Sequence, residues 1–482
     1  MTAQIAPSPA LSQFPLVVDL DGTLIRSDLL HESAIKLVRR RPHLALLLPA
    51  WLAVGKANLK RQIADRVSLE VENLPYNETL MEWLRAERAV GRHVVLCTSA
   101  DARYAQQVAD HLGVFDEVIA SNGVDNVSAK RKAQVLVDRY GQRGFDYAGN
   151  SRDDLPVWAC SRRAIVVDAP PAVQAEARSS AEVEREFDRP KATLRTWGRA
   201  MRLHQWLKNL LVLLPLAGAF QLGNLLLLQQ AVLAFLAFGL CASSVYVLND
   251  IMDLESDRAH PRKKLRPFAS GQLSLPQGLV FALGLLTLSV LTAAAGRPAF
   301  MFWLGAYFTL TLAYTFYLKR RLLADCITLG LLYTLRIIAG GAAVGLAASF
   351  WLISFSLFLF LSLAFVKRYS ELVELAMIGR TDLHGRSYLA SDLPLVQVMG
   401  VAAGFSSVLL LALYINGDTV LKLYSHPEVL WLTIPIQLYW ISRMWMKAQR
   451  GRMHDDPVVF AVRDPYSLAC GALFAATLVA AR

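Results

Sequence analysis

The chain has 482 residues, of which 54% are hydrophobic and 18% are charged. This composition is too apolar for an average soluble protein, and the length is too great for one small domain. The formal net charge is +11. Much of the basic excess lies in short loops between apolar runs, which is typical of the cytoplasmic side of a membrane protein and argues against a nucleic-acid-binding protein.

Residues 1–180 predict a soluble α/β domain. Helical stretches alternate with short apolar runs that end in polar or small residues, and this alternation is typical of a parallel sheet with its chemistry at the carboxyl ends of the strands. The mostly helical residues 27–90 interrupt the alternation and predict an inserted cap. The N-terminus lacks the basic start and apolar core of a secretory signal, so we expect this domain in the cytosol. The predicted strands are FPLVVDL (14–20), RHVVLCTS (92–99), EVIASN (117–122), FDYAGN (145–150) and AIVVDA (164–169).

The cap contains the run LALLLPAWLAVG, residues 44–55. It is too short to cross a bilayer. Two interpretations are open: a packed helix of the cap, or an apolar surface that touches the membrane. The charged residues 181–196 that follow the domain are predicted to be a linker.

The stretch VVDLDGTL places Asp19 and Asp21 directly after the first strand. Two carboxylates at this spacing can divide the work of phosphate chemistry, one attacking phosphorus and the other moving a proton, with Mg²⁺ offsetting the charge. Thr98 ends the second strand, and Lys132 follows later in the chain. Asn150 and Asp154 lie in the stretch YAGNSRDDLPVW.

Together these motifs resemble the haloacid dehalogenase superfamily of phosphatases, over residues 14–180. The resemblance implies that Asp19 is the nucleophile and Asp21 the general acid and base. It also implies that Thr98 and Lys132 hold the phosphate, with Ser99 and Lys130 as alternatives for these two roles. The implied Mg²⁺ ligands are Asp19, Asp21, Asn150 and Asp154.

Asn150 departs from the family pattern, which usually has an acid at this position. An amide oxygen can ligate Mg²⁺ but adds no charge. The alternative hypothesis is therefore an inactive domain kept for binding or regulation. We favour an active phosphatase, because both aspartates of the first motif are present.

Residues 197–482 predict an all-α membrane domain. Lysine and arginine are concentrated in the loops that follow the even-numbered apolar segments, which places those loops on the cytosolic side together with the soluble domain. The prediction is an integral protein of the inner or cytoplasmic membrane. Nine segments are near the length of about 20 residues that a spanning helix needs: 206–222, 225–248, 277–295, 298–318, 322–347, 348–366, 394–415, 429–446 and 466–481.

The stretch NDIMDLESD follows the second apolar segment. On a helix, Asn249, Asp253 and Asp257 are spaced i, i+4 and i+8 and drift by only about 40° per step, so they share one face. Hard oxygen ligands on one face suit Mg²⁺, which usually binds through a few carboxylates and the phosphates of a substrate. The bases that follow, Arg258, Lys263 and Arg266, can bind further phosphate oxygens.

A solvated cytoplasmic loop is the alternative interpretation of this stretch. It explains the bases, which the distribution of charge across the membrane favours on this side. It does not explain an amide and two acids in helical register at the edge of a span, where ionisable groups are costly and usually functional.

The motif NDxxDxxxD and the nine predicted spans resemble the UbiA-type superfamily of membrane prenyltransferases. Members that use a prenyl diphosphate have a second acidic motif after the fourth span. Here Asp325 is present, but Leu329 replaces the second acid. This departure argues against a prenyl diphosphate donor.

Four stretches are similar to the decaprenyl-phosphate phosphoribosyltransferase branch of that superfamily: MRLHQWLKNLLVLLP, DRAHPRKKLRPFASG, LRIIAGGAA and KRYSEL. The resemblance implies 5-phosphoribosyl diphosphate as donor and a polyprenyl phosphate as acceptor. Arg336 lies inside an apolar span, which favours a functional role, whereas membrane anchoring is an alternative for the pair at 367–368. The implied substrate-binding residues are Lys208, Asn209, Lys319, Arg336, Lys367, Arg368 and Tyr369.

The hypothesis that gives both domains one pathway is a Mg²⁺-dependent bifunctional enzyme. The membrane domain transfers 5-phosphoribose to a polyprenyl phosphate, with Asp253 and Asp257 as its catalytic acids, and the soluble domain removes the 5-phosphate. The alternative is a prenyltransferase that uses a prenyl diphosphate and a small aromatic acceptor. The expected partners are the two substrates and the lipid bilayer, with no nucleic acid; a homo-oligomer is compatible with the sequence.

Overall fold

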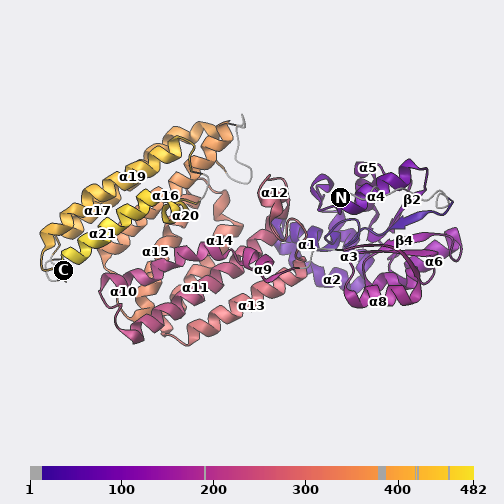
Figure 1. Ribbon diagram of the computed structural model, residues 1–482, viewed down its shortest axis with the longest axis horizontal. Helices are drawn as coiled ribbons and strands as arrows, with labels where there is room; N and C mark the ends of the chain where they lie inside the picture. The colour runs from indigo at the N-terminus through magenta and orange to yellow at the C-terminus, as the bar shows by residue number, and fades with distance from the viewer. Residues whose placement is uncertain (1–12, 189–191, 378–386, 418–419, 421–422, 454–455) are drawn as a thin grey trace. The chain divides into compact units, whose positions relative to one another are not determined.

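The computed structural model describes residues 13–188, 192–377, 387–417, 420, 423–453 and 456–482. The chain forms two compact units (Figure 1). The first contains Met1–Ala200 together with Leu248–Leu279, and the second contains Met201–Val247 together with Val280–Arg482. The stretch with the acidic motif therefore packs within the same unit as the soluble domain.

The first unit is built on a six-stranded parallel sheet with the strand order β3-β2-β1-β4-β5-β6. The five strands predicted from the sequence are confirmed. The bounds are β1 Leu16–Val18, β2 Val94–Asp101, β3 Glu117–Ser121, β4 Asp146–Gly149, β5 Arg163–Val167 and β6 Glu182–Phe187.

The sixth strand lies where a linker was predicted, so the predicted linker at 181–196 is wrong for residues 182–187. The charged sequence EVEREF conceals the strand because an edge strand tolerates charged side chains. Phe187 is buried and packs against Trp83 with their ring centroids 5.7 Å apart. This contact holds the end of β6 in the core.

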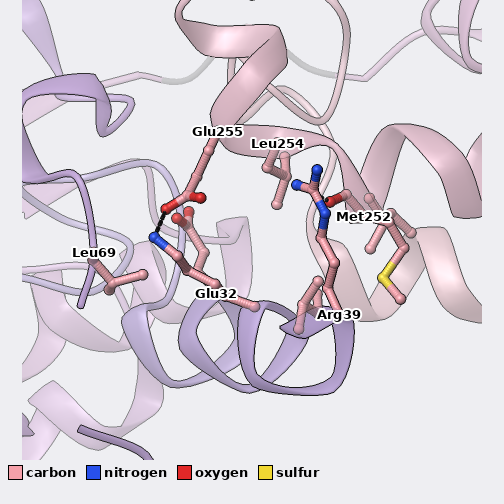
Figure 2. A pocket seen from close by; sticks show the side chains of 9 residues that line it. Glu32, Arg39, Leu69, Met252, Leu254 and Glu255 are labelled. Carbon is pink, nitrogen blue, oxygen red and sulfur yellow. Dashed lines mark hydrogen bonds and ion pairs between the residues drawn. The ribbon is translucent and has the colours of Figure 1, made fainter. Parts of the chain in front are cut away.

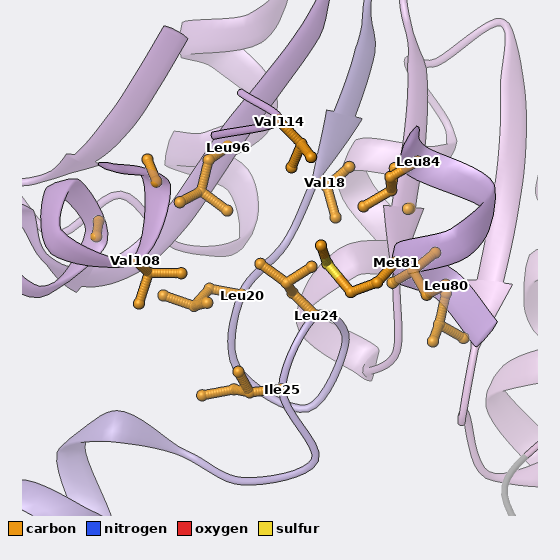
Figure 3. Close-up of a cluster of buried hydrophobic side chains, with 14 of the residues drawn as sticks. Val18, Leu20, Leu24, Ile25, Leu80, Met81, Leu84, Leu96, Val108 and Val114 are labelled. Atoms are coloured by element: carbon orange, nitrogen blue, oxygen red, sulfur yellow. The ribbon is translucent and has the colours of Figure 1, made fainter. Parts of the chain in front are cut away.

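Successive side chains of β1 point to opposite faces of the sheet, as in any β-strand. Val18 lies in one hydrophobic cluster, with side chains of α4 (Glu78–Ala89) and α5 (Ala102–Leu112), as Figure 3 shows. Val17 lies in a second cluster, with side chains of α6 (Ala129–Tyr140) and α8 (Pro171–Ser180). Because α4 contributes to the core against the sheet, the cap is shorter than the predicted 27–90.

The cap itself is helical, as predicted. It has a small cluster of its own, formed by Leu37, Leu59, Ile63 and Val67, with Trp51 packed against it. Leu46 and Val54, by contrast, are 83% and 77% exposed. Its elements are α1 Leu29–Arg40, η2 Pro42–Leu47, α2 Leu48–Val54, α3 Lys56–Ala64 and η3 Val71–Asn73.

In the described part of the chain, six helices are long and apolar enough to cross a membrane, and a seventh span results if the bent pair α20–α21 counts as one. The predicted count of nine is therefore not matched. The six helices are α11 Leu225–Met252, α13 Leu275–Ala294, α14 Pro298–Phe316, α15 Ala324–Val344, α16 Phe350–Met377 and α17 Leu393–Ile415; the bent pair is α20 Pro457–Arg463 and α21 Pro465–Ala480.

Two predicted spans account for the difference between nine and seven. The segment at 206–222 forms a 3₁₀ helix, η5 (Leu203–Leu213), and a short α-helix, α10 (Leu214–Gly218), whose first turn contains Pro215, a residue that the interior of a longer helix does not tolerate. The segment at 429–446 forms η9 (Pro427–Leu432) and then α19 (Thr433–Gln449), whose 17 residues are few for a span.

Gly340 of α15 permits close packing of η5 in the second unit. A Cβ at Gly340 would lie 2.1 Å from the carbonyl oxygen of Val212, which is closer than any real contact. The backbone of η5 therefore lies directly against α15, with no space for a side chain between them.

We expect Gly340→Ala to destabilise the protein by about 1–3 kcal/mol, because the added methyl group overpacks this contact. The measurement is thermal unfolding of the detergent-solubilised chain. The control is Gly284→Ala in α13, where nothing lies within 4 Å of the added carbon. Alanine has a higher helix propensity than glycine, so the control substitution is expected to be neutral or stabilising. Equal behaviour of the two variants would contradict the packing argument.

Candidate functional site

The first polar site lies at the carboxyl ends of the strands of the first unit. Asp19 follows β1, and its backbone N–H donates to the Ala148 carbonyl of β4 at 2.9 Å. Lys132 extends from α6, and its Nζ donates to Asp19 Oδ1 at 2.8 Å. Both side chains are buried. The structure thus brings the predicted nucleophile and one predicted phosphate-binding residue into direct contact.

Tyr147 and Asp154 support this pair from behind. Lys132 Nζ also donates to the Tyr147 hydroxyl at 2.8 Å, and that hydroxyl donates to Asp154 Oδ1 at 2.6 Å. Asp154 Oδ2 accepts the backbone N–H groups of Asn150 and Ser151, each at 3.0 Å. Because its two carboxylate oxygens accept these hydrogen bonds, Asp154 orients Lys132 through Tyr147 and also orients the loop that carries Asn150. Sequence reasoning missed Tyr147, which is an ordinary strand residue by pattern.

Asn150, which follows β4, lies against the loop after β1 that carries the predicted aspartates. Gly22 has a φ of +78°, and a Cβ there would lie 2.1 Å from Asn150 Nδ2. The glycine of DGT is therefore needed for its backbone conformation and for space. Asp21 Oδ1 accepts the backbone N–H of Leu29 at 2.8 Å, which ties the loop to the start of the cap.

The two aspartates lie in an environment that disfavours negative charge. Burial raises the pKa of Asp19 to about 6, although Lys132 opposes the shift. Burial also raises the pKa of Asp21, and the nearby charge of Asp28 adds to the effect. A bound cation would remove this cost, so the site has the electrostatic character of a metal centre.

The structure favours Ser99 over Thr98 at the second motif. Thr98 is fully buried, and its hydroxyl accepts the backbone N–H of Ala100 at 3.0 Å. Ser99 lines the cavity, and its hydroxyl accepts Lys60 Nζ of the cap at 3.0 Å. Burial lowers the pKa of Lys60, whereas Asp21 opposes the shift. Lys60 is a further cation that sequence reasoning missed, because caps have no fixed motif. Lys130 is exposed, in contrast to Lys132.

A cavity of about 410 Å³ is lined by Asp19, Asp21, Ser99, Lys132, Asn150 and Asp154, among other residues. The oxygen atoms of Asp19, Asp21 and the Asn150 amide are the hard ligands that Mg²⁺ prefers, so the residues present fit this ion. Among the residues that the structure describes, no three His, Cys, Asp or Glu side chains converge on one point. An amide, water and substrate oxygens would therefore complete the coordination.

The acidic motif keeps its predicted helical register. The backbone N–H of Asp253 donates to the Asn249 carbonyl at 2.9 Å, and that of Asp257 donates to the Asp253 carbonyl at 2.9 Å. These i to i−4 bonds continue the helical path from α11 into α12 (Leu254–Arg258), although the backbone departs from regular helix at Asp253. The i, i+4 and i+8 spacing is thus kept in the backbone hydrogen bonds, with a break between α11 and α12 at Asp253.

Cations neutralise the two acids of the motif. Arg266 Nη1 lies 2.6 Å from Asp257 Oδ2 and 3.1 Å from Asp250 Oδ1. Burial raises the pKa of Asp257 to about 6, and Arg266 opposes the shift. Arg39 of α1 lies 3.4 Å from Asp253 Oδ1. The structure thus places the basic residue Arg266 beside the acids of the motif.

Helix α1 of the cap lies directly beside the acidic motif within the first unit (Figure 2). Arg39 donates to the Met252 carbonyl at 2.9 Å, and Lys36 forms an ion pair with Glu255. Arg258 forms a bidentate pair with Glu32, at 2.7 and 2.8 Å, and donates to the Ala269 carbonyl at 2.9 Å. Arg258 was predicted to bind phosphate; in this structure it is buried in these contacts. Lys263 lies in the short helix η6 (Lys263–Leu265).

A second polar site lies inside the second unit. Asp456 accepts Lys208 Nζ at 2.7 Å, Lys367 Nζ at 3.4 Å and the Tyr333 hydroxyl at 3.3 Å. Lys208 also lies 5.5 Å from the centre of the Tyr333 ring, which is in range of a cation–π contact. Sequence reasoning missed Asp456, the N-cap residue of α20, because no motif surrounds it in the sequence.

Arg336 extends this site. Its guanidinium donates to Asn209 Oδ1 at 2.9 Å and to the Tyr307 hydroxyl at 2.8 Å. Its Cζ lies 5.5 Å from the centre of the Tyr333 ring. The structure therefore brings together Lys208, Asn209, Arg336 and Lys367, which come from η5, α15 and α16. Two lysines on one buried carboxylate, with Arg336 against the same Tyr333 ring, give this site the charge to bind phosphate.

Three other predicted residues lie outside this arrangement. Arg368 is fully buried, 2.5 Å from Asp325, and is also paired with Glu371. The Tyr388 hydroxyl donates to Asp325 at 2.7 Å. Tyr369 packs edge-on against Trp445, with ring centroids 5.7 Å apart. Lys319 lies in η7 (Leu318–Arg320), at the end of α14.

Comparisons with known proteins find a matching family for each of the two parts of the chain. Residues 211–460 match the UbiA prenyltransferase family, and residues 16–158 match the haloacid dehalogenase-like hydrolases. An uncharacterised protein of Sinorhizobium fredii is 36% identical over 472 residues, which cover 97% of this chain and 91% of that protein.

Two named relatives cover less of the chain. Nodulation protein NoeC of Azorhizobium caulinodans is 36% identical over 282 residues, which cover 58% of this chain and 91% of that protein. Decaprenyl-phosphate phosphoribosyltransferase of Corynebacterium glutamicum is 36% identical over 200 residues, which cover 41% of this chain and 59% of that protein.

The long apolar helices and these matches establish an integral membrane protein. The chain belongs to the UbiA prenyltransferase family and carries a haloacid dehalogenase-like hydrolase domain in its N-terminal part.

Proposed function

We propose that this protein transfers 5-phosphoribose from phosphoribosyl diphosphate to a polyprenyl phosphate and then removes the 5-phosphate. The observation that carries the choice of donor is the state of Asp325. This acid stands where the second metal-binding motif of prenyl diphosphate enzymes begins, yet it is fully buried and paired with Arg368 and Tyr388. It is therefore not free to bind a second metal cluster.

The transfer step follows from the chemistry of the substrates. An oxygen of the lipid phosphate attacks the anomeric carbon, the bond from that carbon to the diphosphate breaks, and pyrophosphate leaves. Mg²⁺ bound by Asn249, Asp253 and Asp257 would supply charge to the leaving diphosphate. Arg266 beside these acids would bind further diphosphate oxygens. Positive charge develops at the anomeric carbon, and the lipid phosphate stabilises it as it attacks.

The cations of the second unit suit the remaining phosphate groups. Lys208, Arg336 and Lys367 come from distant parts of the chain and share one buried polar site. Asp456 holds the two lysines with its carboxylate. A phosphate group that enters this site would replace that carboxylate as the partner of the lysines. Because the lysine side chains are already ordered, binding would cost little conformational entropy.

The second step uses the aspartates of the first unit. Asp19 attacks the phosphorus of the 5-phosphate, and the bond to the ribose oxygen breaks while Asp21 donates a proton to that oxygen. Asp21 then accepts a proton from the water that hydrolyses the aspartyl-phosphate, and inorganic phosphate leaves. Lys132 neutralises the phosphate oxygens throughout, because Asp154 and Tyr147 hold its ammonium group in place. We place both steps at the cytosolic surface of the inner membrane.

We expect Asp253→Ala to abolish phosphoribosyl transfer, because the leaving diphosphate loses a metal ligand. The loss should be about 3 kcal/mol or more, which is about 100-fold in rate. The measurement is radiolabel transfer from phosphoribosyl diphosphate to polyprenyl phosphate in membranes. Ser256→Ala, in the adjoining helix α12, is the control and should retain transfer. A near-parental rate for Asp253→Ala would refute the metal assignment.

We expect Asp19→Asn to leave transfer intact and to make the 5-phosphorylated lipid accumulate. An amide cannot form the aspartyl-phosphate, yet it keeps the shape of the side chain and can still accept from Lys132. Mass spectrometry of the lipid products reads out both steps in one sample. Parental amounts of dephosphorylated lipid would exclude Asp19 as the nucleophile, and loss of transfer would show a regulatory role for this domain instead.

The cap is suited to a substrate that stays in the membrane. Leu46 and Val54 are exposed apolar side chains on a short apolar stretch with basic residues on either side, including Arg41 and Lys56. This pattern is typical of a segment that lies at a bilayer surface. Trp51, by contrast, packs inside the cap. We therefore propose that Leu46 and Val54 contact the bilayer.

Replacing both Leu46 and Val54 with serine should slow hydrolysis of the lipid-linked substrate roughly fivefold, for a loss of about 1 kcal/mol of interfacial contact. Hydrolysis of p-nitrophenyl phosphate should not change. Val90→Ser is the control, since Val90 is half exposed and lies at the end of α4. An equal loss on both substrates would instead indicate that the two residues only stabilise the cap.

A further inference from the structure

The cavity that contains Asp19 has two walls from distant parts of the sequence. One wall is formed by the strand ends and the cap. The other is formed by the segment 258–276, which follows the acidic motif and contributes Arg258, Phe268, Gly271 and the run Leu273–Pro276. We call this segment the second wall. All of these residues belong to the first compact unit.

Buried charge holds the second wall against the cap. Arg258 makes two hydrogen bonds to Glu32 of α1 through Nη1 and Nη2, and its Nε–H donates to the Ala269 carbonyl inside the second wall. Both side chains of the ion pair are about 5% exposed. Since an unpaired charge in such a position is costly, the pair fixes the segment beside α1.

Close backbone packing supports the same arrangement at a second point. Gly271 has a φ of +69°, and a Cβ there would lie 2.6 Å from Arg26 Cβ and 2.7 Å from the Arg26 carbonyl oxygen. Only glycine allows the segment to approach the loop after β1 this closely. Arg199 adds a hydrogen bond to Gln272 at 2.9 Å.

The two walls of the cavity differ in chemistry. Asp19, Asp21 and Lys132 lie on the first wall, and their charges suit a phosphate ester. The second wall contributes the apolar side chains of Phe268, Leu273 and Leu275 beside Arg258 and Ser274. A substrate that fills the whole cavity therefore meets charged groups on the first wall and apolar side chains on the second.

We propose that the second wall completes the phosphatase site as a second cap, and that it selects phosphate monoesters carried on a lipid over small soluble esters. This proposal rests on the phosphatase activity proposed above. The phosphate binds at Asp19 and Lys132, and the apolar part nearest to the headgroup lies against the second wall. The loop of the transferase part thus also serves as a specificity element of the hydrolase.

The test is Pro276→Trp in the full chain, in membranes. Pro276 is exposed and lines the cavity on the second wall. A tryptophan at this position therefore narrows the cavity without replacing a core residue. Gln277→Trp is the matched control, because Gln277 is the next residue, is also exposed and does not line the cavity. The probes are the lipid-linked 5-phosphoribosyl ester, formed in place, and p-nitrophenyl phosphate.

For Pro276→Trp we expect kcat/KM to fall roughly tenfold or more on the lipid-linked ester, a steric effect of the size that pocket changes produce, and to fall much less on p-nitrophenyl phosphate. Gln277→Trp should behave as the parent on both. Equal effects of the two tryptophans, or an equal loss on both esters for Pro276→Trp, would overturn the proposal. Hydrolysis that survives Asp19→Asn would overturn the phosphatase function itself, which keeps the two failures distinct.

Cross-linking gives a measurement that does not depend on activity. His31 of α1 is exposed and lines the same cavity. We expect the pair His31→Cys and Pro276→Cys to be linked within one chain by a short bis-maleimide. The control pair places the first cysteine at Glu70, which is exposed and does not line the cavity. Equal yields for the two pairs, or no link in either, would show that the second wall does not close this site.

Discussion

The ion pair between Glu32 and Arg258 is the interaction on which the arrangement of the first unit depends. It joins residues that are 226 positions apart in the sequence, and both side chains are buried. Removing one partner of such a pair typically costs about 3–5 kcal/mol, because the other charge is left without compensation. This contact joins the cap helix to the segment that follows the acidic motif, and it reaches the second wall of the cavity because Arg258 also donates to the Ala269 carbonyl.

Charge burial governs the second unit in a similar way. Asp456 compensates Lys208 and Lys367, and Asp325 compensates Arg368. The two carboxylates nevertheless differ in use. In the group around Asp325, two carboxylates, Asp325 and Glu371, compensate the one charge of Arg368, whereas Asp456 lies between two lysines. That difference separates a structural ion pair from a site that can accept an anionic substrate.

The sequence allowed prediction of the parts whose chemistry is local. The five core strands, the helical spacing of Asn249, Asp253 and Asp257, and the assignment of Asp19 and Lys132 to one site follow from patterns within a few residues or from motif resemblance. The parts that it did not reveal depend on long-range packing. Strand β6 is charged because it lies at an edge, and Asp456 has no motif around it. Pro215 divides a run that is apolar enough to suggest a span.

The first unit is discontinuous along the chain, and this has a consequence for biosynthesis. Residues up to 200 leave the ribosome first, but the unit also needs residues 248–279, so 279 − 200 = 79 more residues must be made before it is complete. Those residues include α11, an apolar helix that must enter the membrane during the same interval. Domains generally fold as units during synthesis. Here Glu32 can form its ion pair only after Arg258 has been synthesised. The hydrolase site therefore becomes complete only after insertion of the membrane domain has begun.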